Sequence, residues 1–422
     1  MKVLIISTYY HPWQTVGGIR AALLAKHLSK SGQEVAVLTL DERVLPRKDH
    51  SFVRKGVKVR EIRIAPTWVT PYNLRTKSGK EVGFWRKALR KITTYWTPDS
   101  YYYWALKAAN HYIDSTQFNP DVVFSSALPF SNHHAGMRIA GHFHSFWVAD
   151  FRDLWIGNHY ESPAVQARKQ KYLQHQNRTL ASANVVTCIS DEMAQSLKQT
   201  LYAPERVKVL PNAFDDEEIA CRVNPAVRNE KLTLLYTGRL YEGYQDLSCL
   251  FAVLCELSKH GKNIKDFVKI QYAGPDGSLL CHQAANYQME SVVEDLGFIL
   301  REEALRCQRS ADVLLLSSGN GSESDAMVVT GKVFEYLAAR RPILAIGYEH
   351  GDLGNLLRKT KAGEIFSPAD LPGIQKEIQT WFTEWHDSGY VDYAGDVDTV
   401  MSHSWSNRVR SFVSMIEEYK GK

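Results

Sequence analysis

The segment 319–345 combines a polar loop with the start of a helix, and it carries side chains suited to binding an anion. Thr330 is a candidate N-cap, and Gly331 allows a ligand to approach the backbone closely. Lys332 adds a positive charge to the first helical turn, which the helix dipole disfavours unless an anion is bound there. Glu335, one turn later, is suited to accept hydrogen bonds from ribose hydroxyls. We interpret this segment as a site for a bound diphosphate.

A second cation and two glycines stand at other strand-to-helix junctions. Arg239 follows Gly238 at the carboxyl end of an expected strand over 232–236. Ligands of open parallel sheets bind at this end of the strands, so Arg239 is a candidate for the same anion. A surface salt bridge is the alternative. Gly17 and Gly18 open an expected helix whose backbone N–H groups are suited to a phosphate or sugar. A simple tight turn is the alternative there.

Short apolar runs alternate with helical patterns along the chain, which is typical of parallel sheets covered on both faces. The runs form two series. We expect strands over 3–7, 34–40, 120–125, 146–150 and 184–189 in the first series, and over 232–236, 268–273, 298–300, 312–317 and 342–347 in the second. The predicted fold class is α/β, with two doubly wound, Rossmann-like parallel-sheet domains facing a cleft.

The two series also predict the domain organisation. We assign residues 1–208 to an N-terminal domain and residues 209–400 to a C-terminal domain. Residues 401–422 have apolar side chains at helical spacing but no strand to cover, so we expect a helix that packs back on the N-terminal domain. Residues 43–118 interrupt the first series and form a basic and aromatic insertion.

Length and composition exclude several protein classes. The chain has 422 residues, of which 23% are charged and 44% hydrophobic, as in folded proteins of two or three domains. Its six cysteines are scattered without a C-x-x-C pair, which argues against a disulfide framework and a structural zinc site. No stretch is long enough to span a membrane, and the apolar start is too short for a signal peptide. We therefore expect a cytoplasmic protein.

The insertion has the composition of a surface that contacts anionic lipid. Between Arg75 and Lys91 there are seven basic residues and one acidic residue, Glu81. Trp85 lies within this run, and several tyrosines and tryptophans follow it up to Trp104. This mixture over 75–104 favours a peripheral membrane contact. A solvated basic face is the alternative. Nucleic acid is not expected as a partner, because no RNA-binding signature accompanies the run and the net charge is only +5.

Taken together, the motifs resemble the retaining family-4 glycosyltransferases of the GT-B fold. The resemblance is closest to the bacterial surface-polysaccharide enzymes, and it covers nearly the whole chain apart from 43–118. Its motifs are GGIRAALLAKHLSKSGQEVAVLT at 17–39, DFRDLW at 150–155, LPNAFD at 210–215, TGR at 237–239, YAG at 272–274, ADVLLL at 311–316 and GKVFEYLAARRPILA at 331–345.

The resemblance implies a nucleotide-sugar donor bound mainly by the C-terminal domain and an acceptor held by the N-terminal domain. Arg239 and Lys332 would contact the diphosphate, and Glu335 would hold the ribose. Backbone groups around Phe298–Leu300 would contact the base. Asp153 would face the acceptor or the donor sugar. With a UDP-sugar favoured, the expected reaction is transfer of a sugar to a lipid-linked or growing surface glycan.

The chain departs from the family pattern at three places. Met327 stands where the first glutamate of the E-x7-E motif would be, and only the second, Glu335, is kept. The pair Tyr244-Gln245 replaces a basic residue usual shortly after TGR. Arg152 stands where many members have histidine. These departures leave open how the donor sugar's hydroxyls are recognised.

No metal or other cofactor is expected. Asp396 and Asp398 superficially resemble the D-x-D motif of metal-dependent transferases, but they do not follow a strand and lie just before the last helix. We interpret them as structural. Without a metal, basic side chains and helix N–H groups would stabilise the departing diphosphate. The diphosphate itself would accept the acceptor's proton.

Two other functions remain open from the sequence. One is a nucleotide-sugar 2-epimerase of the same fold, although no carboxylate and histidine set for it stands out. The other is a degenerate transferase that serves as a binding subunit, which the methionine at position 327 supports. The donor base and sugar, the acceptor, the linkage and the oligomeric state are not determined by the sequence.

Overall fold

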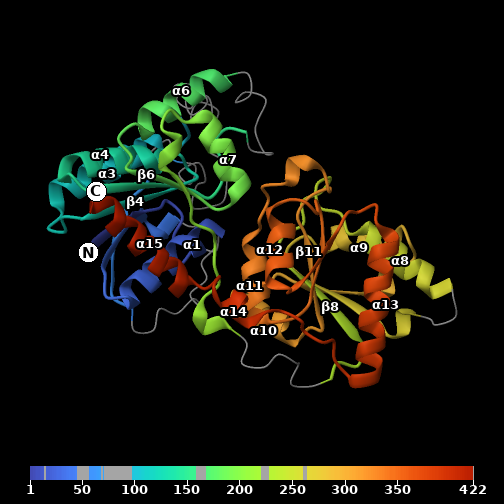
Figure 1. Cartoon of the computed structure of the whole chain (residues 1–422). Coiled ribbons are helices and arrows are strands. Elements are labelled where there is room, and N and C mark those ends of the chain that lie inside the picture. The colour runs from blue at the N-terminus through green and yellow to red at the C-terminus, as the bar shows by residue number, and fades with distance from the viewer. Residues whose placement is uncertain are drawn as a thin grey trace. The chain divides into compact units, whose positions relative to one another are not determined.

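The structure is a computed structural model that describes residues 1–13, 16–44, 57–67, 70, 97–157, 168–219, 228–259 and 264–421. The predicted basic run 75–91, with Trp85, lies outside these residues. The chain divides into two compact units, which we describe separately (Figure 1). The first unit comprises Met1–Pro211 and Arg408–Lys422, and the second comprises Asn212–Asn407.

The described part of the first unit contains a parallel sheet of seven strands in the order β3-β2-β1-β4-β5-β6-β7. The central strands are buried almost throughout, as their apolar sequences predict. The strands are β1 (Lys2–Ile6), β2 (Glu34–Leu40), β3 (Val59–Ile64), β4 (Val122–Ala127), β5 (Phe146–Phe151), β6 (Val185–Cys188) and β7 (Val207–Val209). The helices are α1 (Val16–Lys30), α3 (Tyr102–Ser115), α4 (Ser131–Phe143), α6 (Lys169–Leu180) and α7 (Asp191–Thr200), with short 3-10 helices η1 (Glu42–Val44) and η3 (Pro204–Arg206).

The described part of the second unit contains a parallel sheet of six strands in the order β10-β9-β8-β11-β12-β13. The strands are β8 (Leu232–Thr237), β9 (Val268–Ala273), β10 (Val293–Gly297), β11 (Val313–Ser317), β12 (Ile343–Ile346) and β13 (Gly363–Phe366). The α-helices are α8 (Ser248–Lys259), α9 (Gly277–Ala285), α10 (Arg301–Ser310), α11 (Gly331–Ala339), α12 (Asp352–Thr360), α13 (Leu371–Ser388) and α14 (Val397–Met401). Short 3-10 helices are η4 (Asp216–Glu218), η5 (Ile264–Asp266), η6 (Glu290–Val292) and η7 (Glu323–Asp325).

Both sheets are doubly wound, and each reverses its strand order at one point. The reversal lies between β1 and β4 in the first unit and between β8 and β11 in the second. Loops on either side of a reversal leave the sheet in opposite directions, which opens a space at the carboxyl ends of the strands. The expected ligand-binding segments after β8 and β11 therefore stand at the reversal point of their sheet.

One predicted strand is wrong. The run 298–300 is not a strand but a loop between β10 and α10, and the strand ends earlier, at Gly297. Phe298 and Leu300 are half exposed, with 50% and 51% of their surface accessible. Three apolar residues in a row resemble a buried strand, but only the middle one, Ile299, is partly buried and packs against the core.

The final helix α15 (Trp405–Lys420) begins in the second unit and continues in the first. Phe412 lies edge-to-face with Phe124 of β4, with ring centroids 5.6 Å apart. Tyr419 lies near Phe146 at the start of β5. The apolar face of this helix thus covers the first sheet, as its helical spacing of apolar residues requires.

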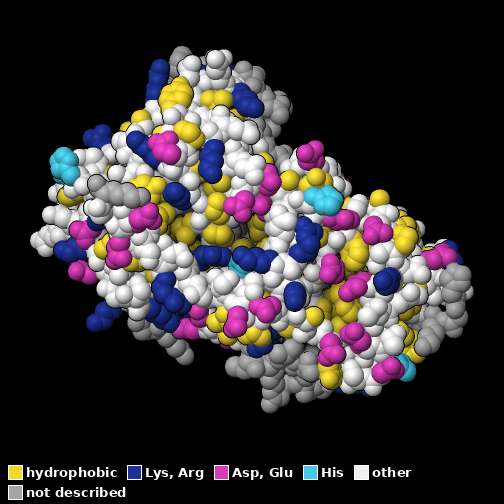
Figure 2. All heavy atoms as spheres, in the orientation of Figure 1, with side chains coloured by type: hydrophobic (Ala, Val, Ile, Leu, Met, Phe, Trp, Pro, Cys, Tyr) yellow, Lys and Arg dark blue, Asp and Glu magenta, His cyan; other side chains and the backbone are white. Residues whose placement is uncertain are grey.

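The described helices include none that is long and apolar enough to cross a membrane. On the face seen in Figure 2, basic and acidic side chains are interspersed. This mixture fits the small net charge of +5.

A buried ion pair holds the carboxyl end of β5. Asp150 is fully buried and accepts hydrogen bonds from Arg20 Nε at 3.1 Å and Nη2 at 2.8 Å. Ser126 and Thr187, on the neighbouring strands β4 and β6, also donate to it. Arg20 donates in addition to the carbonyl of Leu210. Asp150, the first residue of the DFRDLW motif, therefore fixes the strands rather than facing a ligand.

We predict that Asp150→Ala lowers the free energy of unfolding of the first unit by about 3–5 kcal/mol, because it removes the buried carboxylate that accepts two hydrogen bonds from the Arg20 guanidinium. Asp153→Ala is the matched control, since the Asp153 side chain is 53% exposed and should change stability by less than about 0.5 kcal/mol. Calorimetry or denaturant titration measures both. Equal stabilities of the two variants would contradict the prediction.

Candidate functional site

The loop after β8 passes directly beneath the Lys332 side chain. Gly238 has a φ of +95°, in the left-handed region that favours glycine. A Cβ atom at this position would lie 2.8 Å from Lys332 Cε, which is too close. Glycine is therefore required both for the backbone turn and for the approach of the lysine. The structure thus brings together two predicted segments that are 94 positions apart in the sequence, from 238 to 332.

Lys332 is held by neutral oxygen atoms. Its Nζ donates to Tyr236 Oη at 2.8 Å and to the Arg239 carbonyl at 3.1 Å. The ammonium also lies over the Tyr236 ring, 4.2 Å from its centroid. Burial lowers the pKa of Lys332 to about 7, although the charges of Glu335 and Asp276 act in the opposite direction. Near neutral pH this amine is therefore partly deprotonated, and a bound anion would restore its charge.

Three buried tyrosines fix the backbone around Gly238. Tyr236 donates to the Arg239 carbonyl at 3.0 Å, and Tyr272 donates to the Gly238 carbonyl at 2.7 Å. Tyr336 of α11 accepts from the Thr237 amide at 3.0 Å. Tyr272 belongs to the YAG motif and Tyr336 to the EYLAA stretch. These motif residues therefore hold the backbone of the loop in place through hydrogen bonds.

Thr330 is the N-cap residue of α11, as predicted, but its side chain makes no capping hydrogen bond. Its Oγ1 is buried and has no hydrogen-bond partner among the described residues. The hydroxyl remains available to a ligand at the start of the helix, next to Gly331 and Lys332.

Arg239 extends outward and pairs with an acidic residue. Its guanidinium contacts both carboxylate oxygens of Asp276, at 3.2 Å from Nε and 3.1 Å from Nη2. The side chain is 61% exposed. Although burial raises it, contact with Arg239 lowers the pKa of Asp276 below its usual value. The salt bridge that sequence analysis left open as an alternative is thus present. Its partner Asp276 was missed, because the two residues are distant in sequence.

Glu335 is also charge-paired. Its Oε1 accepts from Arg301 Nη2 at 3.1 Å, and Gln308 donates to its other oxygen at 3.4 Å. Arg301 pairs as well with Glu218, whose Oε2 lies 2.8 Å from Nη2. Arg301 directly follows the loop 298–300, so this ion pair places that loop beside Glu335. Neither Arg301 nor Glu218 was predicted, since only the tertiary fold brings them to α11.

Tyr244 and Gln245, which replace a basic residue of the family pattern, tie the β8 loop to the loop after β11. Gln245 donates to the Ser317 carbonyl at 2.8 Å, and Tyr244 donates to Asp325 at 2.8 Å. Asp325 also accepts from the Asn320 amide. These residues hold the polar loop that leads to α11. Their role in the structure is therefore positional.

In the first unit, Gly17 lies against Arg152. A Cβ atom on Gly17 would lie 1.6 Å from Arg152 Nη1, so a larger residue here would require the Arg152 guanidinium to move. The guanidinium donates to the carbonyls of Ala127 and Leu128 and lies over the Tyr9 ring. Gly18 follows in the same first turn of α1, where it is buried.

Asp153 differs from its motif neighbours by its exposure. It is the most exposed of the charged residues in the DFRDLW motif, and its Oδ2 lies 3.9 Å from Arg152 Nε. Gly17, Gly18 and Asp153 belong to the first unit, and the cationic residues described above belong to the second. Their joint action on one ligand stays a prediction.

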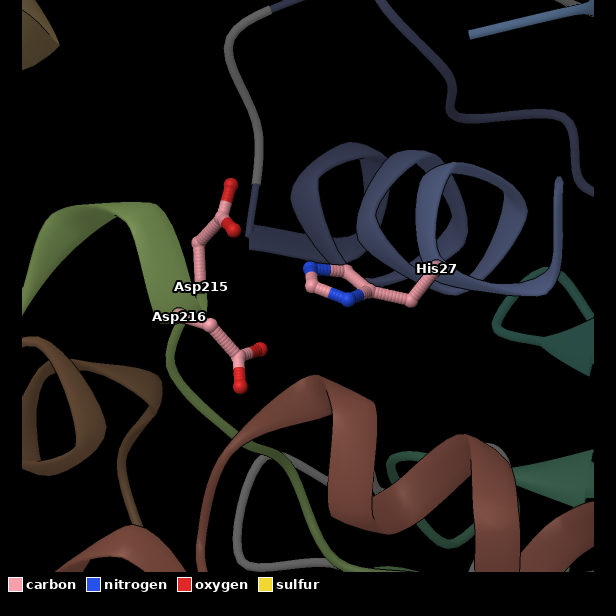
Figure 3. Close-up of side chains that lie close together, drawn as sticks. All are labelled: His27, Asp215 and Asp216. Carbon is pink, nitrogen blue, oxygen red and sulfur yellow. The ribbon is translucent and has the colours of Figure 1, made fainter. Parts of the chain in front are cut away.

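The aspartates near the ends of short helices act as caps. Asp396 accepts from the Thr399 amide at 2.8 Å and begins α14, as its structural interpretation requires. Asp215, the last residue of LPNAFD, caps η4 in the same way. In Figure 3, Asp216 lies on η4 and Asp215 directly precedes it; His27 of α1 is also labelled. Asp216 accepts from the Ser406 amide at 3.1 Å.

The sequence of the first unit matches a known protein family. Residues 17–218 match the model of Glycosyltransferase Family 4. The match supports the assignment of the chain to the family-4 glycosyltransferases. It covers the first unit and the start of the second, including the LPNAFD motif and η4. No curated protein sequence matches the chain.

Solved structures resemble the chain over its whole length. Sucrose-phosphate synthase from Thermosynechococcus elongatus has a TM-score of 0.67 at 14% identity, covering 100% of this chain and 99% of that one. HepE of Anabaena in complex with UDP has a TM-score of 0.63 at 13% identity, covering 99% and 100%. The lipopolysaccharide outer core galactosyltransferase WaaB has a TM-score of 0.56 at 13% identity, covering 99% of both chains. The chain therefore has the GT-B fold.

We predict that Gly238→Ala destabilises the second unit by about 1–3 kcal/mol more than Gly243→Ala does. Both glycines have positive φ, so both variants carry the left-handed backbone cost of about 1–2 kcal/mol. Only the alanine at 238 also meets Lys332, because nothing lies within 4 Å of a Cβ at 243. Denaturant unfolding compares the two, and equal losses would mean that Lys332 does not constrain this position.

Proposed function

We propose that the protein is a retaining glycosyltransferase that moves a sugar from a nucleotide-sugar, with a UDP-sugar favoured, to a lipid-linked or growing surface glycan. The observation that carries the proposal is the position of the Lys332 amine in the first turn of α11, where it donates to Tyr236 Oη and to the Arg239 carbonyl and where desolvation lowers its pKa. The unpartnered Thr330 hydroxyl at the start of the same helix supports it. HepE, which shares the fold, was crystallised with UDP and with UDP-glucose.

Lys332, Thr330 and the backbone of Gly331 would bind the diphosphate at the N-terminus of α11. Ionised phosphate oxygens form strong hydrogen bonds with such donors, and the helix dipole adds to the attraction. Arg239 would reach the same diphosphate by sharing or leaving Asp276. Because Gly238 has no side chain, the loop after β8 can lie close to Lys332 and to the diphosphate.

The nucleoside would extend toward α10. Glu335 would accept from the ribose hydroxyls while Arg301 fixes its carboxylate. The exposed loop at Phe298 and Leu300 would contact the base with its backbone. This direction follows from the Arg301–Glu335 pair, which places the loop beside the carboxylate.

The first unit would hold the acceptor. Asp153, exposed just after β5, would face the acceptor or the donor sugar, and Gly17 and Gly18 at the start of α1 would contact the nucleotide-sugar. In this assignment, residues 1–208 form the acceptor domain, residues 209–400 the donor domain, and residues 401–422 the returning helix.

In the proposed reaction the acceptor hydroxyl oxygen bonds to the anomeric carbon on the face from which the diphosphate leaves. The bond between that carbon and the diphosphate oxygen breaks, and its electron pair stays on the diphosphate. The acceptor's proton passes to a diphosphate oxygen. Lys332, Arg239 and the N–H groups of α11 stabilise the charge that develops, so the reaction needs no metal ion.

We also propose a cytoplasmic location with a peripheral membrane contact through residues 75–104, on the grounds of their basic and aromatic sequence. Tyr101 and Trp104, which the sequence analysis counted toward this contact, are buried in the first unit and take no part in it. Such a contact would bring the enzyme to a lipid-linked acceptor. Sedimentation with vesicles containing phosphatidylglycerol tests it, and unchanged binding after replacing the basic residues of 75–91 with glutamine would refute it.

We predict that the affinity for UDP-glucose is constant below pH 7 and falls above it. The bound diphosphate favours the charged amine, so the pKa of Lys332 is higher in the complex than in the free protein. Above the free pKa of about 7, binding requires proton uptake, and the dissociation constant rises by up to about tenfold per pH unit. Calorimetric titration from pH 6 to 8.5 measures this.

The matched variants for this titration are Lys332→Arg and Lys359→Arg. Arginine stays charged over the whole range, so the first variant should lose the pH dependence. Lys359 is exposed on α12 and should keep it. A pH dependence that persists in Lys332→Arg would assign it to another group.

The function itself is tested with a panel of UDP-, GDP- and dTDP-sugars, with and without lipid-linked glycan acceptors. We expect nucleoside diphosphate release that depends on the acceptor, a product that keeps the anomeric configuration, and activity in the presence of EDTA. Lys332→Met should lower kcat/KM by about 10²–10³-fold, and Lys359→Met should not. Conversion of the donor without acceptor, as by an epimerase, or nucleotide binding without turnover would contradict the proposal.

A further inference from the structure

A cavity of about 110 Å³ lies in the first unit. One of its lining residues is Trp155, which follows Asp153 by two positions in the DFRDLW motif. Its walls come from Trp155 of the motif, from Pro98 before α3, and from Lys171, Tyr172, His175 and Arg178 on α6. Since one water molecule needs about 10–15 Å³ of cavity volume, this cavity has room for a group of several heavy atoms. The sequence analysis did not identify this site.

One wall of the cavity is a fixed aromatic surface. The Trp155 ring stacks on Phe130, with centroids 4.0 Å apart and planes at 16°. Tyr172 and His175 contact the Trp155 ring at its edges, at 5.0 and 5.9 Å. Rings locked by such contacts offer a rigid apolar surface. The apolar C–H face of a pyranose packs well against a surface of this kind.

A second histidine positions His175. The Nε2 atoms of His134 and His175 are 2.9 Å apart, so one ring donates a hydrogen bond to the other. Thr179 lies within hydrogen-bond distance of the same nitrogen of His134. Burial lowers the pKa of His134 to about 4, so this pair is neutral at physiological pH. The pair holds the ring in place at the wall.

The remaining wall is cationic. Lys171 and Arg178 line the cavity from α6, and both are exposed to solvent. Their charges, together with burial, keep the pKa of His175 low. The helix sequence KQKYLQHQNRTL contains no acidic residue. A ligand that fills this cavity therefore meets two positive charges beside an aromatic surface.

We infer that this cavity binds an anionic sugar unit of the acceptor glycan, with the ring against Trp155 and its carboxylate or phosphate between Lys171 and Arg178. The inference rests on the proposed function, which it deepens by giving the acceptor a chemical class. A uronic acid and a sugar phosphate present the same chemistry. The position of the cavity next to Asp153 would place the neighbouring sugar at that carboxylate.

Ligand-observed NMR titration of the full chain tests the inference with D-glucuronate, α-D-glucose 1-phosphate and D-glucose as probes. We expect at least one of the two anionic sugars to bind about tenfold more tightly than glucose. Binding of glucuronate alone identifies a uronic acid as the acceptor unit, and binding of the phosphate alone identifies a sugar phosphate. Equal affinity for all three probes, or no binding, would overturn the inference.

Variants locate the binding. The double variant Lys171→Ala, Arg178→Ala should raise the dissociation constant of the anionic sugar about tenfold, and Trp155→Leu should also weaken it. Lys169→Ala is the matched control, because Lys169 lies exposed on the same helix and does not line the cavity. Unchanged binding by the double variant, with its melting temperature preserved, would place the ligand elsewhere and overturn the inference.

A parallel titration with UDP-glucose separates the two proposals. Lys332→Met should weaken UDP-glucose binding and leave glucuronate binding unchanged. If UDP-glucose binds and is used while the anionic sugars do not bind, the inference is wrong and the proposed function stands. If the anionic sugars bind through Lys171 and Arg178 but no nucleotide-sugar binds, the proposed function fails and the cavity remains an anionic-sugar site.

Discussion

The contact between Lys332 and the end of β8 is the interaction on which the second unit's chemistry depends. An ammonium group buried against a phenol and a carbonyl has favourable hydrogen bonds but no full opposite charge in contact. Part of its desolvation is therefore uncompensated, which is why the pKa of Lys332 falls to about 7. In the proposed function, a bound diphosphate would supply the missing charge. By contrast, Glu335 and Arg239 already have ionic partners in Arg301 and Asp276, so they shape the site more than they drive binding.

The first unit uses buried charge for a different purpose. The Arg20 guanidinium meets Asp150 with two hydrogen bonds, and two hydroxyl groups complete the carboxylate's partners. This pair is compensated within the protein and needs no ligand. It fixes three adjacent strands at their carboxyl ends, where the motif continues outward to Asp153 and Trp155. One short motif thus contains a residue that holds the sheet and residues that meet solvent.

The sequence predicted the central parts of the fold and missed its edges. Strands such as β1, β4 and β11 are buried and apolar, so their pattern is clear. The edge strand β7 is mostly exposed, and β13 is short, so both resemble loops. The predicted cluster at Gly238 and Lys332 could be inferred because parallel strands bring their carboxyl ends together. Its ionic partners could not, since Asp276 and Arg301 reach the site only through tertiary packing. Thr330 takes the predicted N-cap position, but its side chain makes no capping hydrogen bond, because the φ and ψ angles of an N-cap do not require one.

The two proposed ligand sites differ in how their positive charge is held, and this difference assigns them different tasks. Lys332 is half-buried and partly desolvated, so its charge is costly until an anion binds, and a neutral ligand gains nothing from that charge. Lys171 and Arg178 are exposed, so they stay charged but are screened by salt within about 10 Å at 0.1 M ionic strength. An amine that becomes fully charged only when an anion binds suits a donor whose diphosphate must leave during the reaction. A solvated, permanent charge beside a rigid aromatic wall suits an acceptor that must be oriented, held weakly and released once it has been extended.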